Sequence, residues 1–330
     1  MPFFTSEAIF PPGAVAPMSH CATLIALPDG TLLAAWMAGS YEPAPDQFIA
    51  LARRPPESTT WIGPQRAVDT PGHADGQPVL LLDHAGVLWL YHVTLAGQGW
   101  TTAHIRRQRS PDLGHTWTAP ECLGLEEGWM LRSRPLDLST PAHPGHWLLP
   151  IYDEKSWRSL MLLSHDDGAT WRSGTYITTP PGNIHPCVVP LPDGRLLAFL
   201  RTGGPGGSIW RTTSADSGVS WAPPEPTALP NPNAGLDLLR LASGALVLAF
   251  NNSRHRRTPL CIALSDDEGQ TWPHLQTLEC DDGEFSYPTL IERPPGQIHG
   301  VYTWRRQTIR HFECDEAWLR AGAPWTSAER

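Results

Sequence analysis

Short apolar runs alternate with turn residues along the whole chain, and six of these runs follow one pattern. Each begins just after a turn glycine, and successive runs lie roughly fifty residues apart. The six runs are Gly30-TLLAAW, Gly86-VLWLYHV, Gly145-HWLLPIY, Gly194-RLLAFLR, Gly244-ALVLAFN and Gly296-QIHGVYTW. Near-continuous apolar runs of this length are typical of strands that are covered on both faces. We therefore expect six small sheets that pack face to face.

A second repeat falls between these strands and has the pattern S-x-D-x-G-x-[TS]-W. Its four copies are Ser110–Trp117, Ser164–Trp171, Ser214–Trp221 and Ser265–Trp272, and a degenerate copy ends at Trp61. A tight hairpin leaves backbone N–H groups without partners, and a short Asp side chain can accept hydrogen bonds from them. The Gly supplies a left-handed backbone position, and the Trp buries its ring under the turn. The pattern predicts one such hairpin, an Asp box, in each of these repeats.

The two repeats together predict a six-bladed β-propeller with four-stranded antiparallel blades and Asp-box turns. We expect residues 1–330 to form one propeller domain, in which the N-terminal segment closes the last blade. The composition fits many short strands and turns, because 35 Pro and 29 Gly are spread along a chain that is 41% hydrophobic.

The charge and the motifs that are missing exclude several classes of function. A net charge of −9 offers little attraction to nucleic acid or to an anionic membrane. The histidines stand singly without metal-ligand spacing, and no nucleotide-binding motif occurs, so we expect no metal and no cofactor. The six cysteines form no CxxC pair, and the first residues lack the pattern of a signal peptide. We expect a cytoplasmic protein, either a monomer or a homodimer.

Polar residues mark the starts of the innermost strands, which in a propeller converge on the central channel. In four blades a polar residue directly precedes a proline that opens an apolar strand, and two further polar residues hold comparable places. These residues are Gln77, Arg134, His185 and Tyr287, with His20 and Asp237 in the other two blades. Each polar group without a partner away from water costs about 1–3 kcal/mol. Six such residues at equivalent positions favour a ligand pocket on the propeller axis.

The whole chain resembles the Asp-box or BNR-repeat proteins of the sialidase (neuraminidase) superfamily. The segments Pro230–Asp237 (PNPNAGLD) and Phe285–Pro288 (FSYP) are most similar to the bacterial and plant type. The resemblance implies an exo-acting glycosidase for a terminal acidic sugar. It also implies three arginines that hold the sugar carboxylate, an Asp as acid/base, and a Tyr nucleophile paired with a Glu.

The resemblance assigns roles to four residues of this chain. Arg201 matches the second arginine and Arg257 the third, although Arg256 replaces it if the alignment slips by one residue. Asp46 lies where the acid/base Asp is expected, and Tyr287 matches the nucleophile.

Two positions depart from the family pattern. His20 stands in place of the first arginine, and His185 stands in place of the Glu that activates the Tyr. A histidine offers a carboxylate a single hydrogen bond and is only partly protonated near neutral pH, so these two positions do not favour sialic acid itself. With Arg134 and Arg305 as helpers, the arginines still favour an acidic ligand such as a uronic or ulosonic acid.

Further chemistry stays open at this point. Glu42 lies four residues before Asp46 and is a second catalytic candidate. A uronide lyase is an alternative, in which His185 or His20 removes the C5 proton and Tyr287 protonates the leaving oxygen. A non-catalytic carbohydrate-binding propeller is the third possibility. In each case the expected partner is a small molecule or an oligosaccharide.

Overall fold

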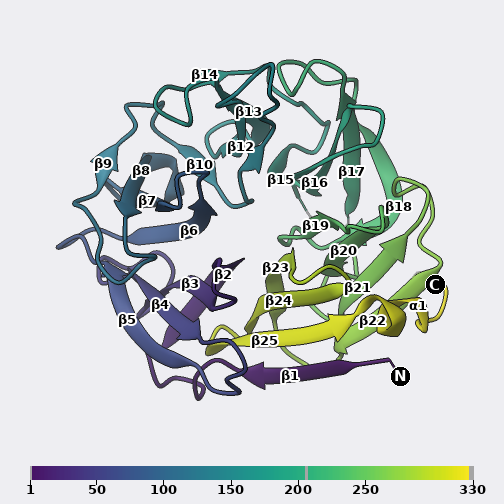
Figure 1. Cartoon of the computed structure of the whole chain (residues 1–330), viewed down its shortest axis with the longest axis horizontal. Coiled ribbons are helices and arrows are strands. Elements are labelled where there is room, and N and C mark those ends of the chain that lie inside the picture. The colour runs from purple at the N-terminus through teal and green to yellow at the C-terminus, as the bar shows by residue number, and fades with distance from the viewer. Residues whose placement is uncertain (1, 205–206, 327–330) are drawn as a thin grey trace.

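The computed structural model describes residues 2–204 and 207–326 of the chain. These residues form six antiparallel sheets that stand as blades around a central axis (Figure 1). Five sheets have four strands each, and the third has five because its inner strand is split into two short pieces. The prediction of a six-bladed β-propeller is confirmed.

The strands follow the same order in every blade, from the axis outward. The innermost strands are β2 (Met18–Ala26), β6 (Asp75–Leu82), β10 (Trp129–Leu131) with β11 (Leu136–Asp137), β15 (Asn183–Pro190), β19 (Asp237–Arg240) and β23 (Phe285–Glu292). The second strands are β3 (Leu32–Gly39), β7 (Leu88–Leu95), β12 (Trp147–Asp153), β16 (Leu196–Thr202), β20 (Leu246–Asn251) and β24 (Gln297–Trp304).

Each blade is completed by a third strand and an outermost strand. The third strands are β4 (Phe48–Arg54), β8 (Ala103–Ser110), β13 (Arg158–Ser164), β17 (Gly207–Ser214), β21 (Leu260–Ser265) and β25 (Thr308–Asp315). The outermost strands are β5 (Ile62–Val68), β9 (Glu121–Cys122), β14 (Arg172–Ser173), β18 (Glu225–Asn231), β22 (His274–Glu279) and β1 (Phe4–Ala8). The short helix η1 (Trp100–Thr102) lies between β7 and β8, and the short helix α1 (Glu316–Arg320) follows the last strand, β25.

The apolar runs of the sequence are the second strands, and they are buried on both faces. All eight residues of β3 are buried, as are all seven of β12 and of β16. The core lies between neighbouring blades: one cluster joins Leu148 and Met161 of the third blade to Leu196 and Leu200 of the fourth. Adjacent blades therefore hold each other through layers of apolar side chains.

The first strand of the chain closes the ring. Strand β1 pairs antiparallel with β25, with Phe4 opposite Cys314 and Ala8 opposite Arg310. The last blade is thus built from both ends of the described chain, as Figure 1 shows at the meeting of purple and yellow. This confirms the expectation that the N-terminal segment completes the last blade.

The Asp boxes form the predicted hairpin bonds. In the last copy, Ser265 Oγ donates to Asp267 Oδ1 (2.7 Å) and accepts from the Gly269 N–H (2.9 Å). Asp267 also accepts from the Thr271 N–H (2.9 Å) and hydroxyl (2.6 Å), and the other three copies repeat these bonds. The residue before the Gly is also left-handed, with φ 57° at Glu268. The sequence pattern did not predict this second left-handed position.

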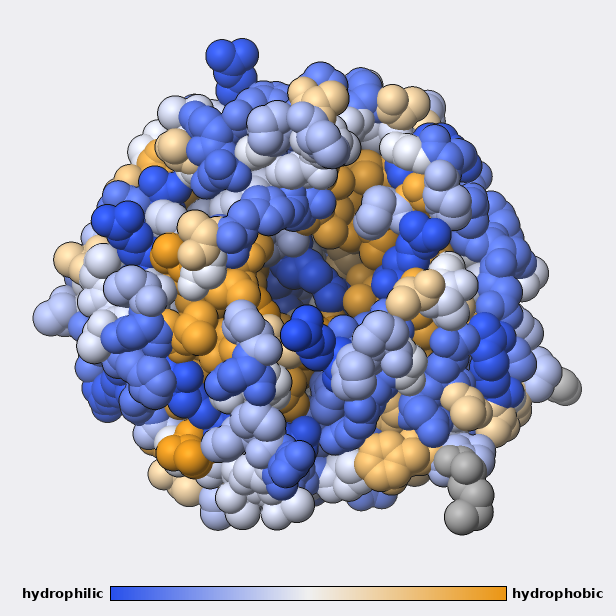
Figure 2. Space-filling model, viewed as in Figure 1, coloured by the Kyte–Doolittle hydropathy of each residue, from blue (hydrophilic) through white to orange (hydrophobic). Residues whose placement is uncertain are grey.

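The two faces of the ring carry different connections. The Asp boxes join third strands to outermost strands, so they lie on one face. The loops from second to third strands, and from each outermost strand to the next blade, lie on the opposite face, which we call the loop face. Figure 2 shows that the molecule is hollowed around the axis and that hydrophilic residues lie in the hollow.

Candidate active site

Four inner strands are bulged near the loop face, and each bulge holds a non-glycine residue in the left-handed region. These residues are Cys21 (φ 61°), Gln77 (φ 51°), His185 (φ 51°) and Tyr287 (φ 54°), and the strand register shifts at each of them. A left-handed non-glycine residue costs about 1–2 kcal/mol. In the first blade the bulged residue is Cys21, whereas we expected His20 in the equivalent place. Four strained residues at one level around the axis point to a functional centre.

Tyr287 lies at this centre and is 5% exposed. Arg201 Nη1 donates to its hydroxyl oxygen at 2.8 Å, while Arg201 Nε donates to Asn233 Oδ1 at 2.7 Å. The Arg201 and Arg257 guanidinium groups lie 5.7 and 5.4 Å from the centre of the Tyr287 ring. A Cβ at Gly235 would lie 3.3 Å from that ring. The PNPNAGLD segment therefore packs closely against the tyrosine and orients one of its arginines.

Arg132 supports the same tyrosine from the backbone side and was missed by the sequence analysis. Its Nη2 donates to the carbonyls of Tyr287 and Pro288, both at 2.9 Å, and its Nη1 donates to Thr289 Oγ1 at 3.1 Å. The side chain is buried, at 5% exposure. Arg132 thus fixes the bulge that presents Tyr287 and adds positive charge beneath the ring.

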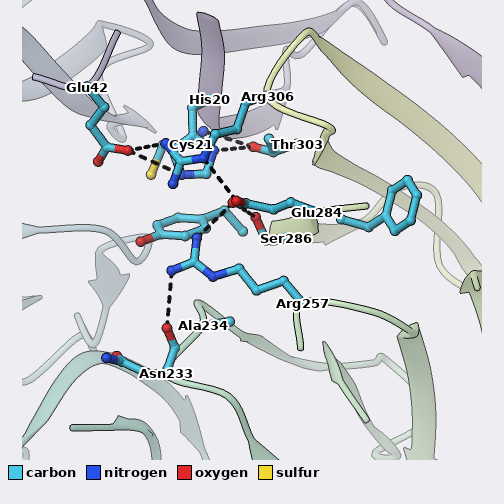
Figure 3. A network of polar contacts seen from close by, with 12 residues as sticks. His20, Cys21, Glu42, Asn233, Ala234, Arg257, Glu284, Ser286, Thr303 and Arg306 are labelled. Carbon is cyan, nitrogen blue, oxygen red and sulfur yellow. Dashed lines mark hydrogen bonds and ion pairs between the residues drawn. The ribbon is translucent and has the colours of Figure 1, made fainter. Parts of the chain in front are cut away.

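Figure 3 shows a chain of ion pairs that includes Arg257, whose guanidinium group lies 5.4 Å from the centre of the Tyr287 ring. Arg257 Nη1 lies 2.7 Å from Glu284 Oε1, and Arg306 Nε lies 3.0 Å from Glu284 Oε2. Arg306 Nη1 also pairs with the Glu42 carboxylate, which reaches across from the β3–β4 loop. Glu284 and Arg306 were not predicted. The only sequence signal for Glu284 is its place directly before the FSYP segment.

His20 is buried in this cluster and carries an unpaired nitrogen. Its Nδ1 lies 2.9 Å from Thr303 Oγ1, and its Nε2 lies 3.9 Å from Glu42 Oε2. Nε2 has no hydrogen-bond partner among the residues that the structure describes. Burial, followed by the positive charge of Arg306 and its neighbouring arginines, lowers the pKa of His20 well below its usual value. The imidazole is therefore neutral and offers one nitrogen toward the site.

His185 is also a buried, neutral imidazole. Burial and the positive charge of Arg201 lower the pKa of His185 well below its usual value. Its Nε2 lies 3.2 Å from Tyr152 Oη, and its ring centre lies 5.4 Å from that of Tyr287. Arg201 Nη1 is almost equally far from the two ring nitrogens, at 3.4 and 3.5 Å, so it does not align with a single lone pair. His185 is an uncharged base beside Tyr287.

Glu154 is a third carboxyl group near the centre and was also missed. It directly follows β12, and no motif in the sequence marks it. Burial raises the pKa of Glu154 from 4.5 to about 7, and the positive charge of Arg201 opposes this rise. Near neutral pH, Glu154 is therefore a carboxyl group that can hold a proton.

The residues described so far form what we call the tyrosine cluster, which consists of Tyr287, His20, Glu42, Arg132, His185, Arg201, Arg257, Glu284 and Arg306. Two predicted site residues lie apart from the tyrosine cluster. Asp46 is exposed and accepts hydrogen bonds from the Ser40 N–H (3.2 Å) and hydroxyl, which lower the pKa of Asp46. Arg305 lies beside Arg306 in the chain but turns away, with its Nη2 3.8 Å from Asp281 Oδ2. The carboxylate that reaches the cluster from the β3–β4 loop is that of Glu42, and the arginine from the β24–β25 turn is Arg306.

Three other candidates lie at the innermost positions of their blades and bond to groups other than the tyrosine hydroxyl. Gln77 Oε1 accepts a hydrogen bond from Cys21 Sγ at 2.8 Å. Arg134 pairs with Asp237 at 2.5 Å, and the same Asp237 oxygen accepts from the Leu290 N–H at 2.7 Å. Arg134 and Asp237 therefore tie three inner strands together. We assign them a structural contribution to the channel wall.

Residues 2–204 and 207–326 contain neither a metal-ligand cluster nor a membrane-spanning helix. No group of three or more His, Cys, Asp or Glu side chains in these ranges could hold a metal ion. Within the same ranges, no helix is long and apolar enough to cross a membrane.

Comparison with known proteins places the chain in a family. The family model described as a BNR repeat-like domain matches residues 30–299. The chain belongs to this family. It is therefore a sialidase-like BNR-repeat protein, as the Asp boxes indicated.

Two relatives in sequence carry sialidase names. The chain is 28% identical over 343 residues to a sialidase of Micromonospora viridifaciens, a match that covers 90% of this chain and 51% of the relative. It is 26% identical over 198 residues to an anhydrosialidase of Macrobdella decora, covering 52% of this chain and 25% of the relative. The chain thus spans about half the length of the first relative and a quarter of the second.

Among solved structures, the Hadza microbial sialidase Hz136 is similar to this chain, with a TM-score of 0.78 at 19% sequence identity. The match covers 96% of this chain and 69% of that protein. At this identity the likeness shows a shared propeller fold.

Proposed function

We propose that this protein is a glycoside hydrolase that releases a terminal acidic sugar, with Tyr287 as its nucleophile. The observation that carries the proposal is the 2.8 Å hydrogen bond from Arg201 to the Tyr287 hydroxyl, inside a cluster that also contains Arg257 and Arg306. The sialidase names of two relatives support the same reaction class.

The charge of the cluster favours an anionic ligand. Four guanidinium groups stand near Tyr287, and three carboxyl groups face them, one of which has a pKa of about 7. The arginines are Arg132, Arg201, Arg257 and Arg306, and the acids are Glu42, Glu154 and Glu284. The excess of positive charge, held partly out of water, attracts a carboxylate. Arg306 supplies a guanidinium group beside His20, where the family pattern would have an arginine.

The reaction proceeds in two steps at the sugar. Tyr287 Oη attacks the anomeric carbon while the bond from this carbon to the leaving oxygen breaks, and neutral His185 takes the tyrosine proton. Glu42 gives a proton to the leaving oxygen. A water molecule then cleaves the bond between Tyr287 and the sugar, and the protons return to Tyr287 and Glu42.

Glu42 is a better proton donor than Asp46 because of where the two carboxyl groups lie. Glu42 stands at the cationic cluster, whereas the Asp46 carboxylate is held by Ser40. A substrate carboxylate at Arg306 competes with Glu42 for that arginine. When the substrate carboxylate takes the place of Glu42 at Arg306, Glu42 loses its ion pair and takes up a proton from solvent, which it then gives to the leaving oxygen.

A panel of aryl glycosides of N-acetylneuraminic acid, an ulosonic acid and uronic acids tests the proposal. Wild type should release the phenol from at least one of them, and Tyr287→Phe should lower this rate by about a thousandfold or more. Tyr176→Phe, a change at an exposed tyrosine away from the centre, is the matched control and should keep full activity. Equal activity of Tyr287→Phe and wild type would refute the tyrosine nucleophile.

A uronide lyase is a second candidate, and the unpaired Nε2 of buried, neutral His20 favours it. In the tautomer that carries its proton on Nδ1, this imidazole has a lone pair at Nε2 that can remove a C5 proton acidified by a nearby arginine. Rhamnose–uronate oligosaccharides distinguish the two reactions, because a lyase gives an unsaturated product that absorbs in the ultraviolet. Ultraviolet absorbance that is lost in His20→Asn, without release of phenol from the aryl glycosides, would favour the lyase. Binding without either signal would favour a non-catalytic propeller.

A further inference from the structure

The inner strand of the third blade is interrupted, and the interruption carries two arginines. Strand β10 ends at Leu131 and β11 begins at Leu136, and both pair with β12. Arg132 and Arg134 stand between them. Among the described strands, each of the other five blades has one continuous inner strand. Backbone that leaves a ladder loses hydrogen bonds, so a break confined to one blade needs a physical reason.

Both arginines bond to the strand that carries Tyr287. This strand, β23, belongs to the sixth blade, which stands opposite the third blade in the ring (Figure 1). Arg132 donates to residues 287–289, and Arg134 Nη1 donates to the carbonyl of the next residue, Leu290. The two side chains therefore hold a continuous stretch of β23 from across the axis. We call Arg132 and Arg134, with these contacts, the axial clamp.

Strand β23 needs these partners because it is bulged at the tyrosine. Its register against β24 shifts between Ser286 and Thr289, so Tyr287 and Pro288 have no place in the ladder. Buried carbonyls that leave a ladder need other donors. Arg132 supplies them from a single planar group, since its Nη2 lies 2.9 Å from each of the two carbonyl oxygens. The fork thus replaces the missing ladder at the left-handed tyrosine.

The buried hydroxyl of Thr289 extends the clamp to the first blade. It accepts from Arg132 Nη1 at 3.1 Å and donates to the Ala22 carbonyl at 2.8 Å. A hydroxyl has one proton to donate, so Thr289 is a donor on one side and an acceptor on the other. Ala22 lies in the bulge of β2, where the register shifts just after His20. The clamp therefore fixes the Tyr287 bulge relative to the one beside His20.

The charge of Arg132 exceeds what a brace for the backbone requires. Arg134 pairs with Asp237, whereas Arg132 has no ion pair among the described residues, and its Nε has no hydrogen-bond partner there. A buried charge without a counter-ion destabilises the fold. The Arg132 guanidinium group lies 5.6 Å from the centre of the Tyr287 ring. A phenolate formed at Tyr287 would supply the missing negative charge, and Arg132 would stabilise it.

We propose that Arg132 is the positioning residue of Tyr287. Through the axial clamp it fixes the backbone of the tyrosine, and its charge faces the ring when the proton leaves. This inference rests on the proposed hydrolase, in which Tyr287 Oη attacks the anomeric carbon. Arg132 acts through Tyr287, whereas Arg201 and Arg257 are the arginines offered to the substrate carboxylate. The interrupted strand of the third blade is then part of the site.

A split between turnover and affinity tests the positioning role. Arg132→Met should lower kcat for the active aryl glycoside by about a hundredfold and weaken calorimetric binding of the acidic monosaccharide by no more than about threefold. Arg132→Lys keeps the charge without the fork and should lower kcat by about tenfold or more. Arg172→Met, at an exposed arginine of β14, is the control. Full activity of Arg132→Lys, or equal losses of kcat and affinity in Arg132→Met, would overturn the proposal.

A matched pair at Thr289 decides the question if the Arg132 variants do not fold. Thr289→Val keeps the shape of the side chain but removes its hydrogen bonds to Arg132 and to Ala22, whereas Thr289→Ser keeps the hydroxyl. We expect kcat to fall by about tenfold in Thr289→Val and to stay near the wild-type value in Thr289→Ser. Equal kcat in the two variants would contradict the clamp.

Carbon NMR of ring-labelled tyrosine separates this inference from the proposed hydrolase. The chain has six tyrosines, and the signal that is lost in Tyr287→Phe belongs to Tyr287. Arg132→Met and Thr289→Val should shift this signal, whereas Arg172→Met should leave it in place. The same shifts in a protein without turnover would refute the hydrolase and still support the clamp. An unmoved Tyr287 signal, with kcat unchanged in both variants, would overturn the clamp while the hydrolase stands.

Discussion

The two faces of this propeller differ in how the polar groups of their turns find hydrogen-bond partners. Each Asp box satisfies its turn from within, since one Ser and one Asp take up the free N–H groups, and four copies use the same bonds. On the loop face, corresponding strand ends carry different residues in every blade. There His20 Nε2 and Gln47 Oε1 are buried without partners among the described residues.

The difference separates the residues that hold the fold from those that we propose to serve a ligand. A turn that completes its own hydrogen bonds needs nothing from outside and can be repeated unchanged. Left-handed residues occur on both faces, and in the Asp boxes they lie in turns that repeat unchanged, as at Glu268. At the axis, Tyr287 and His185 are left-handed in bulged strands, and the nearby His20 Nε2 is buried without a partner among the described residues. These features cost stability unless a function compensates for it. The loop face therefore holds the residues whose replacement should alter activity more than folding.

The largest effect should follow from removing a cation at the centre. Arg201→Met takes away the hydrogen bond to the Tyr287 hydroxyl and the support of Asn233. We expect kcat/KM for the active aryl glycoside to fall by about a thousandfold or more. The melting temperature should stay close to that of Arg172→Met, a change at an exposed arginine of β14. A large loss of stability with little loss of activity would reverse the contrast between the two faces.

Replacing Glu154 should show that a buried carboxyl group near the centre lowers the free energy of unfolding. Its pKa is about 7 in the folded protein and 4.5 in an unfolded chain. Below about pH 4.5 it is protonated in both states and has no effect, and as pH rises through 7 its ionisation destabilises the folded state by at most about 3 kcal/mol. Glu154→Gln should therefore raise the melting temperature at pH 8 and leave it unchanged at pH 4. The same shift at both pH values would exclude titration of Glu154 as the cause.

The adjacent arginines at the β24–β25 turn give a paired test of the cluster. Arg306→Gln removes the partner of Glu42 and Glu284, so we expect the affinity for an acidic monosaccharide to fall by about tenfold to a hundredfold. Arg305→Gln should leave the affinity unchanged, because Arg305 faces Asp281. Calorimetric titration measures both. Equal effects of the two changes would mean that only the overall charge matters.

The smallest effect should come from an Asp box. Ser265→Ala leaves the Gly269 N–H unpaired at a buried position and should cost about 1–2 kcal/mol of unfolding free energy. Ser173→Ala, at an exposed serine of β14, should cost almost nothing. Denaturant unfolding measures both, and KM should not change in either. A change in KM for Ser265→Ala would show that the two faces are coupled.

The fold was predictable because its determinants repeat. The six apolar runs and the four Asp boxes repeat the pattern of a single blade. The number of repeats predicted a closed ring of six blades. The prediction of a single domain over residues 1–330 and of a cytoplasmic location stays a prediction.

The positions of candidate site residues were predictable only where a motif marked them, and the roles of these residues stay predictions. Tyr287, Arg201 and Arg257 lie together near the axis, as expected. At the β24–β25 turn, Arg305 and Arg306 are both left-handed, and a one-residue step reverses which arginine faces the centre. Sequence similarity does not resolve such a step.

The β3–β4 loop shows the same limit. Asp46 lay at the expected distance along the chain, yet the carboxyl group at the cluster is that of Glu42. Glu284, Glu154 and Arg132 belong to no motif, and only the packing of several blades brings them together. Their roles depend on burial and on neighbouring charges, which no local pattern encodes.

The closure of the ring by β1 and β25 links the assembly of the cluster around Tyr287 to the completion of synthesis. Tyr287, Glu284 and Arg306 all come from the last blade, and the Ser19 N–H beside His20 donates to the Arg306 carbonyl at 2.8 Å. While the ribosome is still making the first five blades, His20 and Glu42 have none of these partners, because the last blade has not yet been synthesised. A shortened product that ends before β23 would carry five blades and four intact Asp boxes, but it would have neither Tyr287 nor a strand to pair with β1.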